Sequence, residues 1–168
     1  MLMSESIPSP DRHHLLAAQG WVELGNVREA TAELDQIAPA LNSHPAVLEV
    51  RWQIHAHSKN WNECVELAAA IIRTDPTVAM GWIHRSYALH ELNRTAEARD
   101  GLMSVVGIFP EELTIPYNLA CYECKLGNPS KARQWLKKIF STEHAEEWRA
   151  TALDDLDLKP LWSDIPKL

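Results

Sequence analysis

The sequence predicts an all-α chain built from stacked helix–turn–helix units, and three observations support this class. Runs of alternating Val, Ile and Thr between tight turns, which are typical of strands, are missing from the sequence. Ala, Leu, Glu and Arg instead fill periodic stretches of roughly 12–14 residues, separated by Gly, Asn or Pro. Finally, Pro76 and Pro110 each follow one such stretch and precede another, and they are 34 residues apart. A fixed period of this length indicates a repeat architecture.

Four segments that begin at Asp11, Pro45, Ala79 and Leu113 place similar residues at the same positions. A small residue occupies the twentieth position, where it lets the second helix of a unit approach the first. Aliphatic or small residues occupy the twenty-fourth and twenty-seventh positions and form one stripe of that second helix. The fifteenth position holds Gly or Asn in three segments, and these residues suit the left-handed backbone that ends a helix. The columns are Gly25, Lys59, Asn93, Gly127; Ala30, Cys64, Ala98, Ala132; Leu34, Ala68, Leu102, Leu136; and Ile37, Ile71, Val105, Ile139.

The period divides the chain into a flexible N-terminal segment, four repeats and a C-terminal part. The bounds are 1–10 for the flexible segment, 11–44 for a degenerate first repeat, 45–78, 79–112 and 113–140 for the other repeats, and 141–168 for a capping helix and tail. A stacked array needs a capping element with a polar outer face, and Thr142 can N-cap a helix over 142–153. Leu161 and Trp162 are expected to anchor the tail.

The sequence also predicts the environments of two classes of side chain, acidic and large aromatic. Acidic residues follow the capping helix at Asp154, Asp155 and Asp157, and without apolar surroundings they predict a solvated turn. Large aromatic residues stand at packing positions of the repeats, and these side chains are predicted to lie in the core. They are Trp61, Trp82 and Trp135.

Two stretches of the sequence carry a family resemblance. The stretch GWIHRSYALHELNRTAEARDGL places Trp82 fourth and Ala98 twentieth in its segment, and Pro110 follows at position thirty-two. The stretch YNLACYECKLGNPSKARQWL places Gly127 and Ala132 in the matching columns. This pattern resembles the tetratricopeptide repeat (TPR) family over about residues 11–140. The resemblance implies a right-handed superhelical array of TPR units with a C-terminal capping helix, working as a non-catalytic protein-interaction scaffold.

In TPR arrays the first helix of each unit lines a concave groove, chiefly through positions 2, 5, 6, 9, 12 and 13. The resemblance therefore implies a groove that binds a peptide or helix of a partner protein. Tyrosines offer rigid area and a hydroxyl as recognition anchors, and an asparagine can bond a peptide backbone. The implied groove residues are Glu49, Gln53, His57, Met80, Ile83, His84, Tyr87, His90, Tyr117, Asn118, Cys121 and Lys125.

The net charge and composition limit the classes of partner that this chain is expected to bind. The net charge is −7, and no basic run occurs, which argues against nucleic acid and anionic membranes as partners. The expected partner is a neutral to weakly basic protein or peptide, and self-association as a homo-oligomer is the alternative. No apolar run approaches the roughly 18 residues of a membrane helix, and residues 1–10 lack signal-peptide features. We therefore expect a cytoplasmic protein with reduced thiols.

A Cys-x-x-Cys pair, Cys121 and Cys124, is the main feature that would indicate chemistry instead. Three residues apart on a helix, the two thiols share a face. They supply two of the four ligands of a zinc site, although His57, His84 or His90 could add another. A redox pair would require a helix N-terminus. We expect packing residues and no cofactor, with a metal or redox site as the alternative. Phosphate-binding loops and the HExxH and GxSxG motifs do not occur, so no enzymatic activity is expected.

Overall fold

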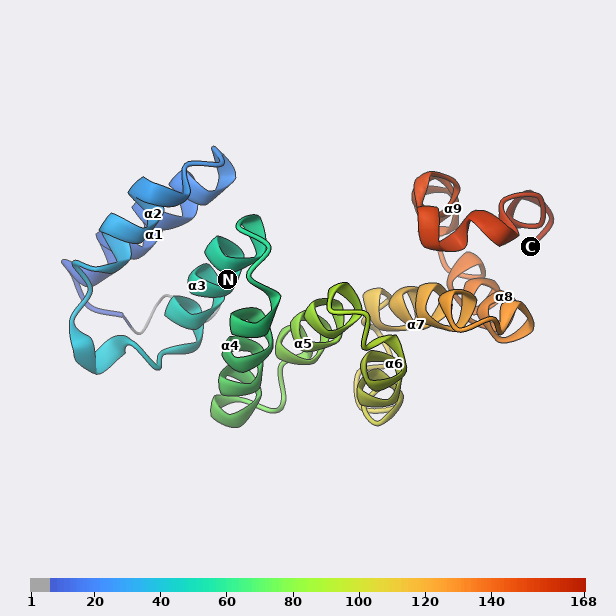
Figure 1. The fold of residues 1–168 in the computed structure, drawn as a ribbon, viewed down its shortest axis with the longest axis horizontal. Helices are drawn as coiled ribbons and strands as arrows, with labels where there is room; N and C mark the ends of the chain where they lie inside the picture. Colours follow the sequence, from blue (N-terminus) through green and yellow to red (C-terminus); the bar gives the residue numbers. More distant parts are fainter. Residues whose placement is uncertain (1–6) are drawn as a thin grey trace. The chain divides into compact units, whose positions relative to one another are not determined.

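A computed structural model of the chain describes residues 7–168, and these residues fold into α-helices, short 3-10 helices and turns (Figure 1). The prediction of an all-α chain is confirmed. The chain forms two compact units, which divide between Ala88 and Leu89, inside helix α5 (Ala79–Glu91). The predicted flexible segment 1–10 lies outside the described residues as far as residue 6. Ile7 is already part of the hydrophobic core, with 2% of its surface exposed.

The first unit is made of helical hairpins. α1 packs against α2 and α3, and α3 packs against α4 (Figure 1). Asn26 accepts a hydrogen bond from the backbone N–H of Glu29 and so caps the start of α2. His44 caps α3 in the same way through Nδ1. The bounds are α1 Asp11–Glu23, α2 Val27–Leu34, a 3-10 turn at Pro39–Leu41, α3 Pro45–His57 and α4 Trp61–Thr74, followed by the start of α5.

The second unit contains the remaining helices and the C-terminal tail. α7 packs against α6 and α8, and α9 packs against α8. The capping helix begins at Ala145 and not at Thr142, because the Thr142 hydroxyl donates to the carbonyl of Ile139. The bounds are α6 Thr95–Met103, α7 Thr114–Lys125, α8 Pro129–Phe140, α9 Ala145–Asp154, η2 Leu156–Leu161 and η3 Ile165–Lys167. Within residues 7–168, every helix falls short of the length and apolar content that crossing a membrane requires.

The small and aliphatic residues at equivalent positions of the 34-residue segments lie in the hydrophobic core. Every residue at the twentieth, twenty-fourth and twenty-seventh positions of the four segments is at most 4% exposed. The twentieth position shows why a small residue is needed. In the second segment the Cys64 thiol lies 3.7 Å from the carbonyl oxygen of Trp52, so α4 directly contacts the backbone of α3. A larger side chain at this position would separate the two helices of the hairpin.

The fifteenth position ends the first helix of each hairpin in the left-handed region. The backbone φ is 72° at Gly25, 56° at Lys59, 61° at Asn93 and 80° at Gly127. Glycine adopts this conformation without steric cost and asparagine tolerates it, whereas Lys59 does so against its preference. The column therefore reflects one turn geometry, and Lys59 shows that packing on both sides maintains that geometry without a favourable residue.

The three tryptophans predicted to lie in the core are only partly buried: Trp61, Trp82 and Trp135. Trp61 and Trp82 lie near the starts of α4 and α5, whereas Trp135 lies mid-helix in α8; in each case part of the indole stays accessible. Trp82 donates from Nε1 to the carbonyl of Pro76, and Lys138 lies over the ring of Trp135.

Two glycines inside helices should respond in opposite directions to the same substitution. A Cβ at Gly81 would lie 2.9 Å from Ile72 Cγ1 and 3.0 Å from Ile71 Cγ2, whereas a Cβ at Gly20 would meet nothing within 4 Å. We expect Gly81→Ala to lower the free energy of unfolding by about 1–3 kcal/mol through overpacking. Gly20→Ala should raise it by about 0.5–1 kcal/mol through helix propensity. Urea titrations followed by circular dichroism measure both, and equal signs would contradict the close approach of α4 and α5.

Candidate functional site

The residues of the implied groove fall into two groups, one in each unit. The first group lies on α3 and on the part of α5 that precedes Leu89. The second lies on the end of α5 and on α7. The first group is Glu49, Gln53, His57, Met80, Ile83, His84 and Tyr87, and the second is His90, Tyr117, Asn118, Cys121 and Lys125.

In the first unit a polar network joins α3 to α5. The Nε2 atom of His84 lies 2.8 Å and 2.9 Å from the two carboxylate oxygens of Glu49. The amide nitrogen of Gln53 donates to the same carboxylate at 3.1 Å. The imidazole of His84 also stacks on the indole of Trp52, with 3.7 Å between ring centroids and 4° between ring planes. Trp52 stands where TPR units usually have a small residue, and this stacking accommodates its bulk.

Beside this network lies an open hollow with aromatic walls, which we call the aromatic hollow. Tyr87 is 41% exposed and meets Trp61 edge to face, with 5.6 Å between centroids and 74° between planes. It meets Trp52 similarly, at 6.4 Å and 63°. The hollow has a volume of about 340 Å³, which suits one side chain better than a whole cofactor. Its lining residues are Val22, Trp52, Gln53, Ala56, His57, Trp61 and Tyr87.

The implied groove residues of the first unit thus differ in what they can contact. Gln53, His57 and Tyr87 line the aromatic hollow, and Glu49 and His84 fix its wall from behind. Met80 is exposed, whereas Ile83 is only 7% exposed and supports the surface from below. Sequence reasoning missed that Trp61 is only partly buried and that Trp52, at 8% exposure, forms the buried wall of this hollow. The unusual bulk of Trp52 at the eighth position of its segment was the available signal.

In the second unit the chain covers its own α7 with the acidic stretch 155–157, which we call the acidic cover. The hydroxyl of Tyr117 donates to Asp155 Oδ2 at 2.9 Å, and the thiol of Cys121 reaches the same oxygen at 3.4 Å. The other carboxylate oxygen, Oδ1, accepts from the backbone N–H of Asp157 at 2.9 Å. Asp155 therefore satisfies two side chains of α7 and the turn that follows α9.

Asp157 makes the second set of contacts of the acidic cover. Its Oδ2 lies 2.8 Å from His90 Nε2, and its Oδ1 accepts from Lys125 Nζ at 3.2 Å. His90 is oriented by its other ring nitrogen, 3.0 Å from the hydroxyl of Thr95. Trp162 closes the turn from outside by donating to the carbonyls of Ala152 and Asp155. Four of the five implied groove residues of this unit thus contact the acidic cover.

The acidic cover changes two expectations from the sequence. Tyr117 and Cys121 are only 6% and 5% exposed, and the ring of Tyr117 packs against Trp148 at 4.8 Å, so neither is available as a recognition anchor. Asp155 and Asp157 are half-buried and bonded, so the predicted solvated turn is wrong for both; Asp154 is exposed, but it is the last residue of α9. Because the acidic cover folds back onto α7, its carboxylates reach hydrogen-bond donors that are distant in sequence. Asn118 is partly exposed.

The thiols of the Cys-x-x-Cys pair are held in the neutral form. Burial raises the pKa of Cys121, and the Asp155 carboxylate raises it further. Burial also raises the pKa of Cys124, and Asp157 adds to that shift. Burial, followed by repulsion from Glu63, raises the pKa of Cys64 to about 11. A metal ligand or redox nucleophile must be a thiolate, which these surroundings disfavour. Among residues 7–168 no group of three or more His, Cys, Asp or Glu side chains gathers in metal-binding geometry.

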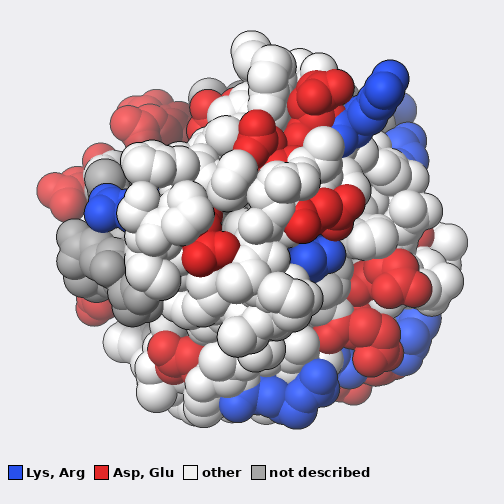
Figure 2. All heavy atoms as spheres, turned by 90° about the vertical axis from the view of Figure 1, so that its left-hand side faces the viewer, with Lys and Arg blue, Asp and Glu red and all other residues white. Residues whose placement is uncertain are grey.

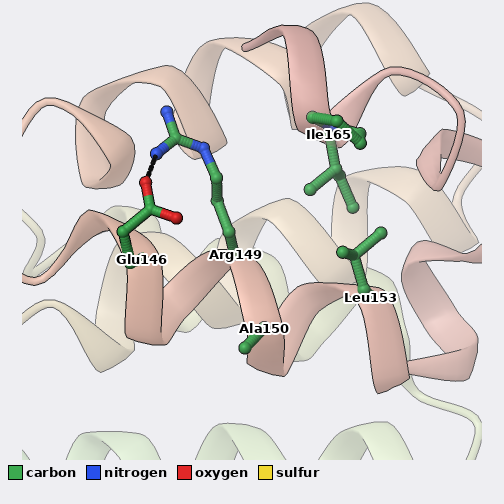
Figure 3. Close-up of a pocket in the computed structure, with 6 residues that line it drawn as sticks. Glu146, Arg149, Ala150, Leu153 and Ile165 are labelled. Atoms are coloured by element: carbon green, nitrogen blue, oxygen red, sulfur yellow. Dashed lines mark hydrogen bonds and ion pairs between the residues drawn. The ribbon is translucent and has the colours of Figure 1, made fainter.

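A second hollow, of about 560 Å³, lies between α9 and the C-terminal turns (Figure 3). Arg149 and Glu146 point toward each other on one side, 2.6 Å apart, while Leu153 and Ile165 approach each other on the other. The guanidinium of Arg149 also stacks on Phe140 at 4.8 Å. Because its cation is engaged by a carboxylate and a ring, this hollow offers an apolar floor without a clear polar contact for a ligand.

On the face that Figure 2 shows, Asp and Glu side chains lie among the Lys and Arg side chains.

Comparisons with known proteins identify the fold. No protein-family model matches the chain. No curated protein matches it either. Solved structures of MamA do match: the MamA RS-1 ArsTM double mutant superposes with a TM-score of 0.68 at 12% identity, covering 90% of this chain and 82% of that one. MamA MSR-1 gives 0.64 at 19%, covering 90% and 86%, and MamA AMB-1 gives 0.62 at 19%, covering 86% and 81%. The chain therefore has the TPR-type helical-repeat fold of these structures.

Neighbouring aspartates provide a matched test of the acidic cover. Asp155→Ala would leave the Tyr117 hydroxyl and the Cys121 thiol buried without their acceptor, so we expect it to lower the free energy of unfolding by about 1–3 kcal/mol. Asp154→Ala removes an exposed carboxylate and should change it by less than about 0.5 kcal/mol. Thermal and urea unfolding monitored by circular dichroism compare the two variants. A similar small effect of both would show that the acidic cover does not stabilise the unit.

The raised thiol pKa values predict slow modification of the folded protein. At pH 8 we expect Ellman's reagent to react with all three cysteines at least about tenfold more slowly than in denaturant, because both burial and protonation protect them. For Cys64, folding raises the pKa from 9.0 to about 11, so ionisation opposes folding and stability should fall as the pH rises through that interval. Stopped-flow absorbance measures the rates of thiol modification. A thiol of the folded protein that reacts as fast as it does in denaturant would contradict the predicted protection.

Proposed function

We propose that this protein is a non-catalytic interaction module that binds a segment of a partner protein on the surface of α3 and α5 in its first unit. The observation that carries the proposal is the aromatic hollow, where three aromatic side chains line an open depression of about 340 Å³. Of these three, Tyr87 is 41% exposed and Trp61 is half-buried, and accessible aromatic residues are typical hot spots of protein interfaces.

Support also comes from how the surface is held. The Glu49 carboxylate fixes both Gln53 and His84, and His84 stacks on Trp52, so the wall of the hollow is ordered before any partner arrives. Preorganisation of this kind lowers the entropic cost of binding. In the second unit the equivalent surface of α7 is already covered by Asp155 and Asp157, which leaves the first unit as the place where a partner segment would bind. The TPR-type fold is compatible with this role, although a fold by itself does not define a function.

Site-specific photocrosslinking tests the proposal. A photoreactive benzoylphenylalanine replaces exposed His57 at the aromatic hollow in one sample and exposed Glu66 on α4 in a matched control. After irradiation in lysate of the native host, we expect His57 to capture a partner that Glu66 does not. Adding Tyr87→Ala to the His57 sample should reduce capture at least about tenfold, because interface anchors carry most of the binding energy.

Other outcomes would overturn the assignment. Capture from Glu66 alone would move the partner to the surface of α4, and capture from neither position would remove the first unit as the binding surface. If the captured protein is a second copy of the chain, the surface mediates self-association, and the proposal of a separate partner falls. Tyr117 is unsuitable for this experiment because its truncation would disturb the packing with Trp148 and Asp155 before it affected a partner.

A further inference from the structure

We infer that the aromatic hollow binds the cationic side chain of an arginine or lysine in a partner segment. This inference rests on the proposed function and specifies its chemistry. The relevant observations are the ring geometry, the polar groups at the rim and the charge around the hollow.

The ring geometry favours a cation. Tyr87 stands at 74° to Trp61 and at 63° to Trp52, so its ring is steeply inclined to both indoles. The face of an aromatic ring carries the negative part of its quadrupole, and a cation within about 6 Å of a ring centroid is attracted by it. Walls set at steep angles allow more than one ring to contact the same cation.

The rim supplies acceptors that suit a guanidinium or ammonium group. The Gln53 amide nitrogen already donates to Glu49, so its carbonyl oxygen is the atom that remains to accept from a ligand. His57 also lines the hollow and is exposed, so its imidazole is a second candidate acceptor. The stem of an arginine or lysine would pack on Val22 and Ala56, since these long side chains bury their methylene groups and leave the charge near polar atoms.

The charges around the hollow also favour a cationic ligand. Its lining contains no Lys, Arg, Asp or Glu, so an incoming cation meets no fixed positive charge there. The carboxylate of Glu49 lies one turn before Gln53 on α3 and contacts it directly. The chain as a whole carries a net charge of −7, which attracts cationic segments over longer distances.

The test uses model peptides, since the partner is unidentified. The probe is Ac-Gly-Gly-Arg-Gly-Gly-NH2, compared with the same peptide carrying citrulline, which has the shape of arginine without its charge, or norleucine, which is apolar. Titrations of the full ¹⁵N-labelled chain follow the indole N–H signals of Trp52 and Trp61. We expect the arginine peptide to shift these signals saturably and to bind about three- to thirtyfold more tightly than the citrulline peptide.

Variants locate the effect. Trp61→Leu keeps an apolar side chain but removes one ring, so we expect it to abolish most of the preference for arginine over citrulline. Tyr87→Leu provides a second variant in case Trp61→Leu unfolds, which circular dichroism detects. Trp135→Leu is the matched control: it removes a partly buried tryptophan of the second unit and should leave the preference unchanged.

Each contrary result has a distinct meaning. Equal binding of the arginine and norleucine peptides would make the hollow an apolar pocket and overturn the inference, as would equal loss of preference in Trp135→Leu. If photocrosslinking from His57 captures a partner but no peptide shows a charge preference, the inference fails and the proposed function stands. If the arginine peptide binds as expected but no partner is captured, the hollow is a cation site and the proposed function fails.

Discussion

The close approach of two helices across a small residue is the constraint on which the rest of this structure depends. At the twentieth position of each 34-residue segment, Ala30, Cys64, Ala98 and Ala132 are fully buried. Where α2 packs on α1, α4 on α3 and α8 on α7, the aliphatic stripe of the second helix meets the first helix. The turn that joins them must also reverse the chain within a few residues, which the left-handed backbone of Gly25, Lys59, Asn93 and Gly127 achieves. The first helix of each hairpin is thereby left with one face toward solvent or another segment, and the candidate binding residues are on that face.

The fold was largely predictable from the sequence, because helical periodicity and a fixed repeat are local signals that accumulate over the chain. The columns that defined the repeat are the buried ones. The binding surface was less predictable. The repeat pattern places a residue such as Tyr87 or Tyr117 on a face, but it does not show what else packs on that face. Tyr87 remains 41% exposed, whereas Tyr117 is 6% exposed because a segment more than thirty residues later in the chain covers it.

The failures of sequence reasoning have one physical origin. Asp155 and Asp157 were predicted to be solvated because the sequence does not show which distant side chains pack on them, yet Tyr117, His90 and Lys125 reach them through the fold. Trp61 looked like a core residue because large aromatic side chains usually bury most of their area, yet it stands beside Tyr87 at the edge of a hollow. A carboxylate or an indole can be stable in either setting, and only long-range contacts decide which setting applies.

The acidic cover also has a consequence for how the chain emerges from the ribosome. Asp155 is synthesised 30 residues after Lys125, the last residue of α7. At about 5–20 residues per second, roughly 1.5–6 s pass between the completion of that helix and the arrival of its acceptor. During this interval the nascent α7 presents Tyr117 and Cys121 without the carboxylate that later binds both. The second unit therefore completes its folding only after translation has passed the end of α9.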